Sequence, residues 1–130
     1  TQSFYRTLRQ RLNPEGIVAV QSEPCMEGNL EAFTAISNTL KSVFPRVFPY
    51  HTMIPSFSFD WGFNLASLGP SPLEMAANVV DNRLEERGCK SLRSYDGTAH
   101  SGLFTLPKHV REALGRETRI ITEDDPLVVV

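Results

Sequence analysis

The apolar residues of the chain fall into alternating helix-like and strand-like segments. The opening segment, residues 4–12, repeats large apolar side chains every three or four positions, which predicts an amphipathic helix. The Asn-Pro pair at residues 13–14 ends that helix, and Gly16 begins the turn that follows. The next run, IVAV at residues 17–20, is short and rich in β-branched residues. This composition is typical of a strand that is buried on both faces, as in a parallel sheet.

The middle of the chain predicts a helix followed by two strands. Residues 29–44 carry a helical stripe of apolar side chains, with Asn29 as the expected N-terminal cap. Residues 47–55 and 62–68 have the composition of strands. The link between these strands is too short for a crossover helix, so the pattern predicts an antiparallel hairpin.

The last third of the chain predicts two helices and little else. Ser71 and Pro72 begin a helix that is expected to run to Arg87 and to end at Gly88. Residues 91–104 have the composition of a loop, and a last short helix is predicted with Thr105 as its cap. The remaining tail is strand-like.

This order of elements predicts an α/β fold with a mainly parallel sheet that ends in an antiparallel hairpin. It matches the C-terminal portion of a class I methyltransferase-like Rossmann fold. The sequence has no initiator methionine and starts inside a helical pattern without an evident cap, so residues 1–130 are expected to be the C-terminal part of a longer domain. In open sheets of this kind, ligands bind at the carboxyl ends of the strands. Gln21 and the segment 56–61 are therefore expected to face one pocket.

Composition and charge exclude several classes of function. The chain has 130 residues, a net charge of −2 and a pI near 5.9, which gives no basic footprint for nucleic acid. No apolar run is long enough to cross a membrane. The cysteines, Cys25 and Cys89, have no metal or redox spacing and are read as reduced thiols of a cytoplasmic protein. The histidines lack the spacing of zinc ligands, so no metal site is expected.

The candidate binding residues lie where the two predicted strands end. The Gln21 amide can both donate and accept hydrogen bonds, which suits it to orient an amine or a ribose. Phe57, Phe59 and Trp61 alternate, which would place their rings on one side of an extended segment, around an alkyl chain or an ammonium group. Asp60 could anchor a cationic amine. Each residue also has a structural alternative. Gln21 could bond only to loop backbone, the aromatic rings could form the core of the hairpin, and Asp60 could be a solvated loop carboxylate.

Four motifs resemble one family in order and in spacing. The motifs are LNPEGI, NTLKSVF, PYHTMIPSFSFDWGFNLAS and SLRSYDG. They resemble the C-terminal half of the polyamine aminopropyltransferases, the spermidine and spermine synthase family, and most strongly the thermospermine synthases.

The resemblance implies transfer of an aminopropyl group from decarboxylated S-adenosylmethionine to a polyamine, with spermidine giving thermospermine or spermine. It implies no cofactor beyond this co-substrate, no metal and a homo-oligomer. Gln21, Phe57, Asp60 and Trp61 are the substrate-binding residues that it implies, although Phe57 stands where the family usually has tyrosine. The nucleotide-binding motif and the general-base aspartate are expected before Thr1, which would leave the isolated piece inactive. Two alternatives remain: a methyltransferase-like enzyme that uses S-adenosylmethionine, and a non-catalytic relative that acts as an oligomerisation module.

Overall fold

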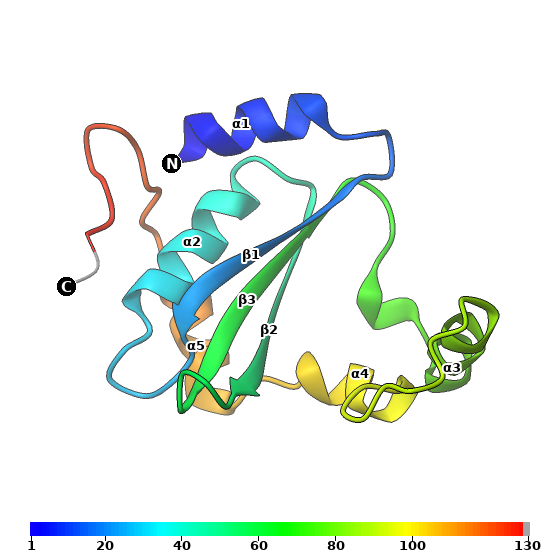
Figure 1. Ribbon diagram of the computed structural model, residues 1–130. Helices are drawn as coiled ribbons and strands as arrows, with labels where there is room; N and C mark the ends of the chain where they lie inside the picture. Colours follow the sequence, from blue (N-terminus) through cyan, green and yellow to red (C-terminus); the bar gives the residue numbers. More distant parts are fainter. Residues whose placement is uncertain (129–130) are drawn as a thin grey trace.

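The computed structural model describes residues 1–128 and shows one small sheet flanked by helices (Figure 1). The described elements, in chain order, are α1 (Gln2–Arg11), β1 (Ile17–Pro24), α2 (Glu31–Lys41), β2 (Arg46–Ile54), β3 (Phe59–Ser67), the 3-10 helix η1 (Pro72–Glu74), α3 (Ala77–Glu86), α4 (Gly97–Leu103) and α5 (Lys108–Arg116).

The sheet has the strand order β1-β3-β2, and β3 is antiparallel to both of its neighbours. The α/β class and the antiparallel hairpin are thus confirmed. β1 and β2 run in the same direction, as strands of a parallel sheet do, but β3 returns between them. Within the described part of the chain every strand pair is therefore antiparallel.

Helix α2 covers one face of the sheet and contacts all three strands, while α1 and α5 pack against α2. Gly62 shows which β3 side chains face this helix, because a Cβ atom built on it would lie 2.4 Å from Cδ2 of Phe33. Side chains alternate between the faces of a strand, so Asn64 and Ala66 also face α2. Trp61 and Phe63 point to the other side, which is called the distal face below.

The prediction that β1 is buried on both faces is wrong for this chain. Ile17 and Ala19 are exposed, and Ile17 keeps 47% of its surface accessible. Val18 and Val20, which alternate with them, are half-buried on the α2 side. The reason is that α2 covers only one face and β1 forms an edge of the sheet.

The beginnings of the first two helices differ from the prediction. Thr1 caps α1, because its hydroxyl accepts a hydrogen bond from the Phe4 amide at 3.5 Å. Asn29 does not cap α2, which starts two residues later without a side-chain cap. The Asn29 amide instead donates to the Met26 carbonyl in a tight turn.

The region after the sheet contains more helix than the pattern predicted. Ser71 does act as a cap, but for η1, and extended backbone at Met75 and Ala76 separates η1 from α3. The predicted loop contains α4, whose first turn is held by Asp96, since its carboxylate accepts from the Ala99 amide at 2.7 Å. Thr105 donates back to the Ser101 carbonyl and does not cap α5.

The tail after α5 forms no strand as far as residue 128, and side-chain hydrogen bonds tie it to α2. The Ile121 amide donates to the Thr39 hydroxyl at 2.9 Å, and the Thr34 hydroxyl donates to Glu117 at 2.6 Å. Burial raises the pKa of the Glu117 carboxyl, but the hydrogen bonds from Thr34 and from the Arg119 and Thr118 amides, with the charge of Arg119, outweigh it and lower the pKa below its usual value. The final two valines of the predicted strand-like tail lie outside the described residues.

The two cysteines are both free, and their surroundings differ. Burial, and secondly the negative charge of Asp60, raise the pKa of the Cys25 thiol to about 12, whereas Cys89 is exposed. Iodoacetamide near neutral pH is expected to label Cys89 in the native protein and Cys25 only after denaturation, as peptide mass mapping would show. Equal native labelling of both cysteines would contradict this packing.

The raised pKa of Cys25 also has a consequence at alkaline pH. As the pH rises from the ordinary thiol value of 9.0 toward about 12, the unfolded chain releases this proton while the folded chain keeps it. The contribution of the Cys25 thiol to the free energy of unfolding is therefore complete below pH 9.0 and is lost as the pH rises from 9.0 to about 12.

Candidate functional site

Gln21 lies at the carboxyl end of β1, next to a bulge. It pairs with Phe63 of β3, and the register then shifts between Gln21 and Pro24. Glu23, inside the bulge, has a φ of 69°, in the left-handed region that few side chains adopt. Bulges often occur beside active sites, where they redirect a neighbouring side chain.

A buried polar pair holds this bulge in place. The Asn64 side-chain amide donates to the Ser22 hydroxyl at 2.9 Å, and that hydroxyl donates to the Val20 carbonyl at 2.9 Å. Both Asn64 and Ser22 are fully buried on the α2 side. Gln21 is consequently fixed on the distal face, where its side chain is exposed.

Phe57 reaches Trp61 through a tight turn. The amides of Phe57 and Ser58 both donate to the Ile54 carbonyl, and Ser58 has a φ of 60°. The ring centres of Phe57 and Trp61 are 4.5 Å apart, with the planes tilted by 50°. The prediction that residues 57–61 are extended is therefore correct only from Phe59 onward, because Phe57 and Ser58 belong to the turn at the tip of the hairpin.

Asp60 lies on the face opposite to Trp61. Its carboxylate is 2.6 Å from Nδ1 of His51, which pairs with Gly62 and so shares the α2 face. Alternation along β3 causes this separation, because Asp60 and Trp61 are consecutive strand residues. The structure thus brings Gln21, Phe57 and Trp61 to one side of the sheet and Asp60 to the other.

The distal face carries several aromatic side chains beside Gln21. Trp61 and Phe63 lie two residues apart on β3, and Phe57 packs on Trp61. This surface is open, since Phe57 keeps 43% of its area accessible. The indole Nε1 of Trp61 is shielded from solvent and has no hydrogen-bond acceptor within residues 1–128. Within these residues it is a buried donor without a partner, in a part of the ring that faces the protein interior.

The sequence pattern did not single out two aromatic residues of this face, Phe63 and Tyr50. Tyr50 stacks on Phe63 with ring centres 5.2 Å apart and also contacts Phe104 at 5.3 Å. Burial raises the pKa of the Tyr50 hydroxyl. Continuing the alternation of residues 59 and 61 would have found Phe63. Tyr50 required the pairing register of β2 and β3.

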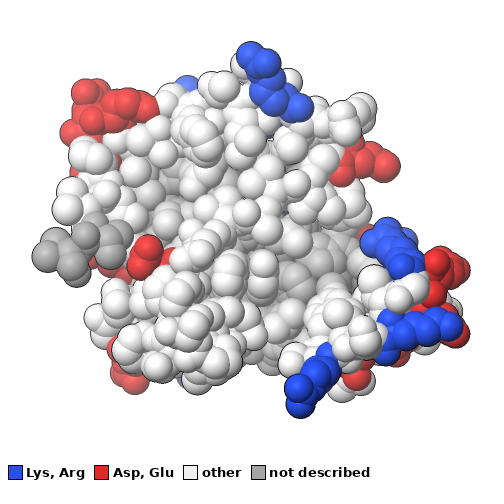
Figure 2. Space-filling model, in the orientation of Figure 1, with Lys and Arg blue, Asp and Glu red and all other residues white. Residues whose placement is uncertain are grey.

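Few charged side chains lie at the centre of the face that Figure 2 shows. Figure 2 shows lysine, arginine and acidic side chains at the margins of the view, while the area over the sheet is uncharged and hollowed toward η1 and α3. A cavity of about 360 Å³ lies next to Ile17 and Leu65, and its lining includes the buried His100 and two basic side chains, Arg83 and Arg87.

The chemistry of Gln21, Phe57, Trp61 and Phe63 is that of a binding surface. None of these side chains titrates, so they can orient an amine and cover its methylene groups but cannot remove a proton. Within residues 1–128 no three metal-ligating side chains come together, and no helix has the length and apolarity to cross a membrane.

Comparison with known proteins identifies the family. The model of the spermine/spermidine synthase domain matches residues 1–71. The polyamine aminopropyltransferase of Sulfurisphaera tokodaii is 40% identical over 129 residues, which are 99% of this chain and 42% of that protein. The corresponding protein of Sulfolobus acidocaldarius is 38% identical, over 98% of this chain and 42% of its own length. The chain belongs to the spermine/spermidine synthase family.

Solved structures agree on the fold. The spermidine synthase of Thermotoga maritima superimposes with a TM-score of 0.75 at 24% identity, over 88% of this chain and 39% of that chain. A spermidine synthase in complex with the transition state analogue AdoDATO gives a TM-score of 0.74, over 88% of this chain and 38% of its own. The present chain therefore spans about two fifths of the length of the relatives that it matches.

Proposed function

We propose that the protein containing this chain transfers an aminopropyl group from decarboxylated S-adenosylmethionine to a polyamine, and that Gln21, Phe57 and Trp61 form part of its acceptor site. The observation that carries the proposal is that Gln21 and the Phe57–Trp61 pair lie on the same open face of the sheet. An amide beside aromatic rings suits a substrate that alternates amine groups with methylene chains.

Residues 1–130 would then be the C-terminal part of the catalytic domain. The edge of β1 is unpaired in the described chain, and the exposed Ile17 and Ala19 lie beside it. A preceding segment that supplies the nucleotide site would pair with this edge and cover these side chains. The family relationship and the unpaired edge of β1 support the proposal that residues 1–130 are the C-terminal part of the domain.

The reaction needs an acceptor nitrogen with a free lone pair, because an ammonium group cannot attack the carbon beside the sulfonium. Gln21, Phe57 and Trp61 carry no titratable group, so none of them can act as the general base. We assign the general base to an aspartate before Thr1. Gln21 would orient the reacting amine, while Phe57 and Trp61 would line the alkyl chain. Phe57 lacks the hydroxyl of the usual tyrosine and supplies only a wall.

The Asp60 carboxylate is assigned a positioning role in this proposal. Its pairing with His51 on the α2 face supports a function in holding the hairpin, with no direct contact to the amine. Spermidine as acceptor, with thermospermine or spermine as product, rests on the resemblance of the hairpin motif to the thermospermine synthases. A homo-oligomeric state is proposed on the same basis. A cytoplasmic location is proposed from the cysteines, which are both free thiols.

Product analysis tests this function. The full-length protein is expected to convert spermidine and decarboxylated S-adenosylmethionine to a product that carries one more aminopropyl group, whereas residues 1–130 alone give none. Gln21→Ala should lower kcat/KM for spermidine about tenfold, the effect of one lost hydrogen bond to a charged or reacting group. Gln10→Ala, an exposed glutamine on α1, is the matched control and should leave it unchanged.

Other outcomes would overturn the proposal. Methylated products from intact S-adenosylmethionine would indicate the methyltransferase-like alternative. A full-length protein with neither activity would indicate a non-catalytic relative.

A further inference from the structure

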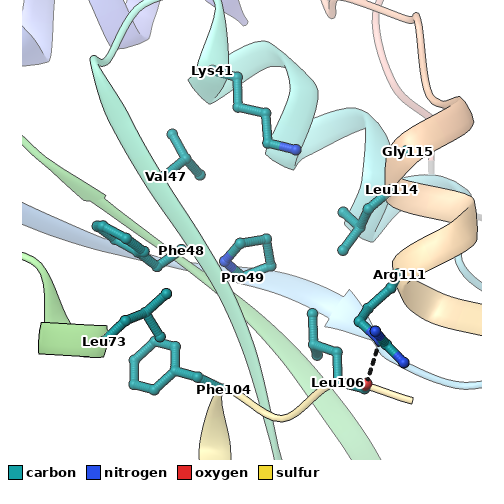
Figure 3. Close-up of a pocket in the computed structure, with 10 residues that line it drawn as sticks. All are labelled: Lys41, Val47, Phe48, Pro49, Leu73, Phe104, Leu106, Arg111, Leu114 and Gly115. Carbon is teal, nitrogen blue, oxygen red and sulfur yellow. Dashed lines mark hydrogen bonds between the residues drawn. The ribbon is translucent and has the colours of Figure 1, made fainter. Parts of the chain in front are cut away.

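The outer edge of β2 borders a cavity that the proposed acceptor site does not use (Figure 3). The cavity has a volume of about 350 Å³ and lies between β2, the start of η1, the end of α4 and α5. Its lining is largely apolar, and it includes the side chains of Lys41 and Arg111. Arg111 Nε donates to the Leu106 carbonyl at 3.1 Å, and within residues 1–128 neither cation forms a salt bridge.

Pro49 determines which backbone groups of β2 face this cavity. Pro49 pairs with Asn64, but proline has no N–H, so this pair cannot be a hydrogen-bonded one. Hydrogen-bonded and non-bonded pairs alternate in an antiparallel ladder, which turns the backbone groups of Val47 and Pro49 outward. The Val47 N–H and the Val47 and Pro49 carbonyls are consequently available at the edge, and no other element within residues 1–128 bonds to them.

Side chains line the β2 edge on both faces of the sheet. Val47 and Pro49 face α2 and α5, where Leu106, Leu114 and the two cations lie (Figure 3). Phe48, on the distal face, lies with Leu73 and Phe104. A strand added at the edge would place successive side chains alternately into these two regions.

We propose that this edge groove binds an extended peptide in which acidic and apolar side chains alternate, by addition of a strand to β2. The backbone of the peptide bonds to Val47 and Pro49, its acidic side chains meet Lys41 and Arg111, and its apolar side chains contact Leu73 and Phe104. A second copy of this chain fits less well. Its β2 strand, RVFPYHTMI, has no acidic side chain that could meet Lys41 and Arg111.

Fluorescence anisotropy with the full-length protein tests the groove. The labelled peptide Glu-Val-Glu-Val-Glu-Val is expected to bind, and Lys-Val-Lys-Val-Lys-Val and an N-methylated version of the acidic peptide are expected to bind at least tenfold more weakly. The double variant K41E/R111E should lose at least tenfold in affinity for the acidic peptide. R116E, an exposed arginine of α5 outside the cavity lining, is the matched control and should keep the wild-type affinity.

The remaining outcomes overturn the proposal. Equal binding of the N-methylated peptide would mean that charge alone attracts the ligand. Absence of binding, or equal affinity of K41E/R111E, would show that the groove is not the site. Self-association that K41E/R111E changes would assign the edge to a second copy. Aminopropyl transfer is read separately and does not depend on any of these results.

Discussion

Replacing Trp61 with alanine is expected to raise KM for the polyamine about tenfold to a hundredfold while KM for decarboxylated S-adenosylmethionine stays unchanged. The indole forms the centre of the proposed wall, between Phe57 and Phe63. Each methylene group of the polyamine that is buried against the ring contributes about 0.8 kcal/mol. Loss of two or three such contacts therefore costs about 2 kcal/mol, and each 1.4 kcal/mol corresponds to a factor of about ten. Steady-state kinetics with each substrate varied in turn would measure the effect.

Two variants distinguish substrate binding from general loss of structure. Trp61→Phe retains an aromatic face and should recover most of the affinity for the polyamine. Phe4→Ala removes an exposed ring on α1, far along the chain from the hairpin, and should change neither KM. If Trp61→Ala raised both KM values equally, the assignment of this ring to the acceptor would be wrong.

Gly97→Ala is expected to lower the free energy of unfolding by about 3 kcal/mol, at the upper end of the range for overpacked sites. A Cβ atom at this position would lie 2.0 Å from the Ala77 carbonyl oxygen, which belongs to the backbone of α3. The Gly97 amide also donates to Asp81 at 2.7 Å. Helix α4 would have to separate from α3, and that bond would be lost.

The control lies in the same helix. A Cβ atom added to Gly102 would meet open space, with no neighbouring atom within 4 Å, so Gly102→Ala should stabilise the protein by about 0.5–1 kcal/mol. Urea unfolding followed by circular dichroism would measure both variants. Equal stability of the two variants would contradict the close approach of α3 and α4.

The sequence allowed prediction of the elements with strong periodicity and of the residues at the strand ends. The alternation of side chains along a strand correctly predicted that Trp61 lies on the face with the other aromatic rings. The same alternation places Asp60 on the opposite face, because consecutive strand residues face opposite sides. The pairing of Asp60 with His51 across the hairpin depended on register, which the sequence did not specify.

Other features were decided by tertiary contacts. Helix α4 is rich in residues with weak helix propensity, and the Asp96 cap and the contact with α3 hold it. The exposure of Ile17 follows from the absence of a second covering layer within residues 1–128. The position of β3 between β1 and β2 depends on which strands pair with each other. Local sequence patterns carry little information about such pairing.

A crystal structure of the full-length protein with spermidine bound would show directly which face of the sheet holds the acceptor. We expect an amine nitrogen within hydrogen-bonding distance of the Gln21 side chain and methylene groups against the rings of Phe57 and Trp61. Spermidine bound on the α2 side of the sheet, beside His51 and Asp60, would contradict this expectation.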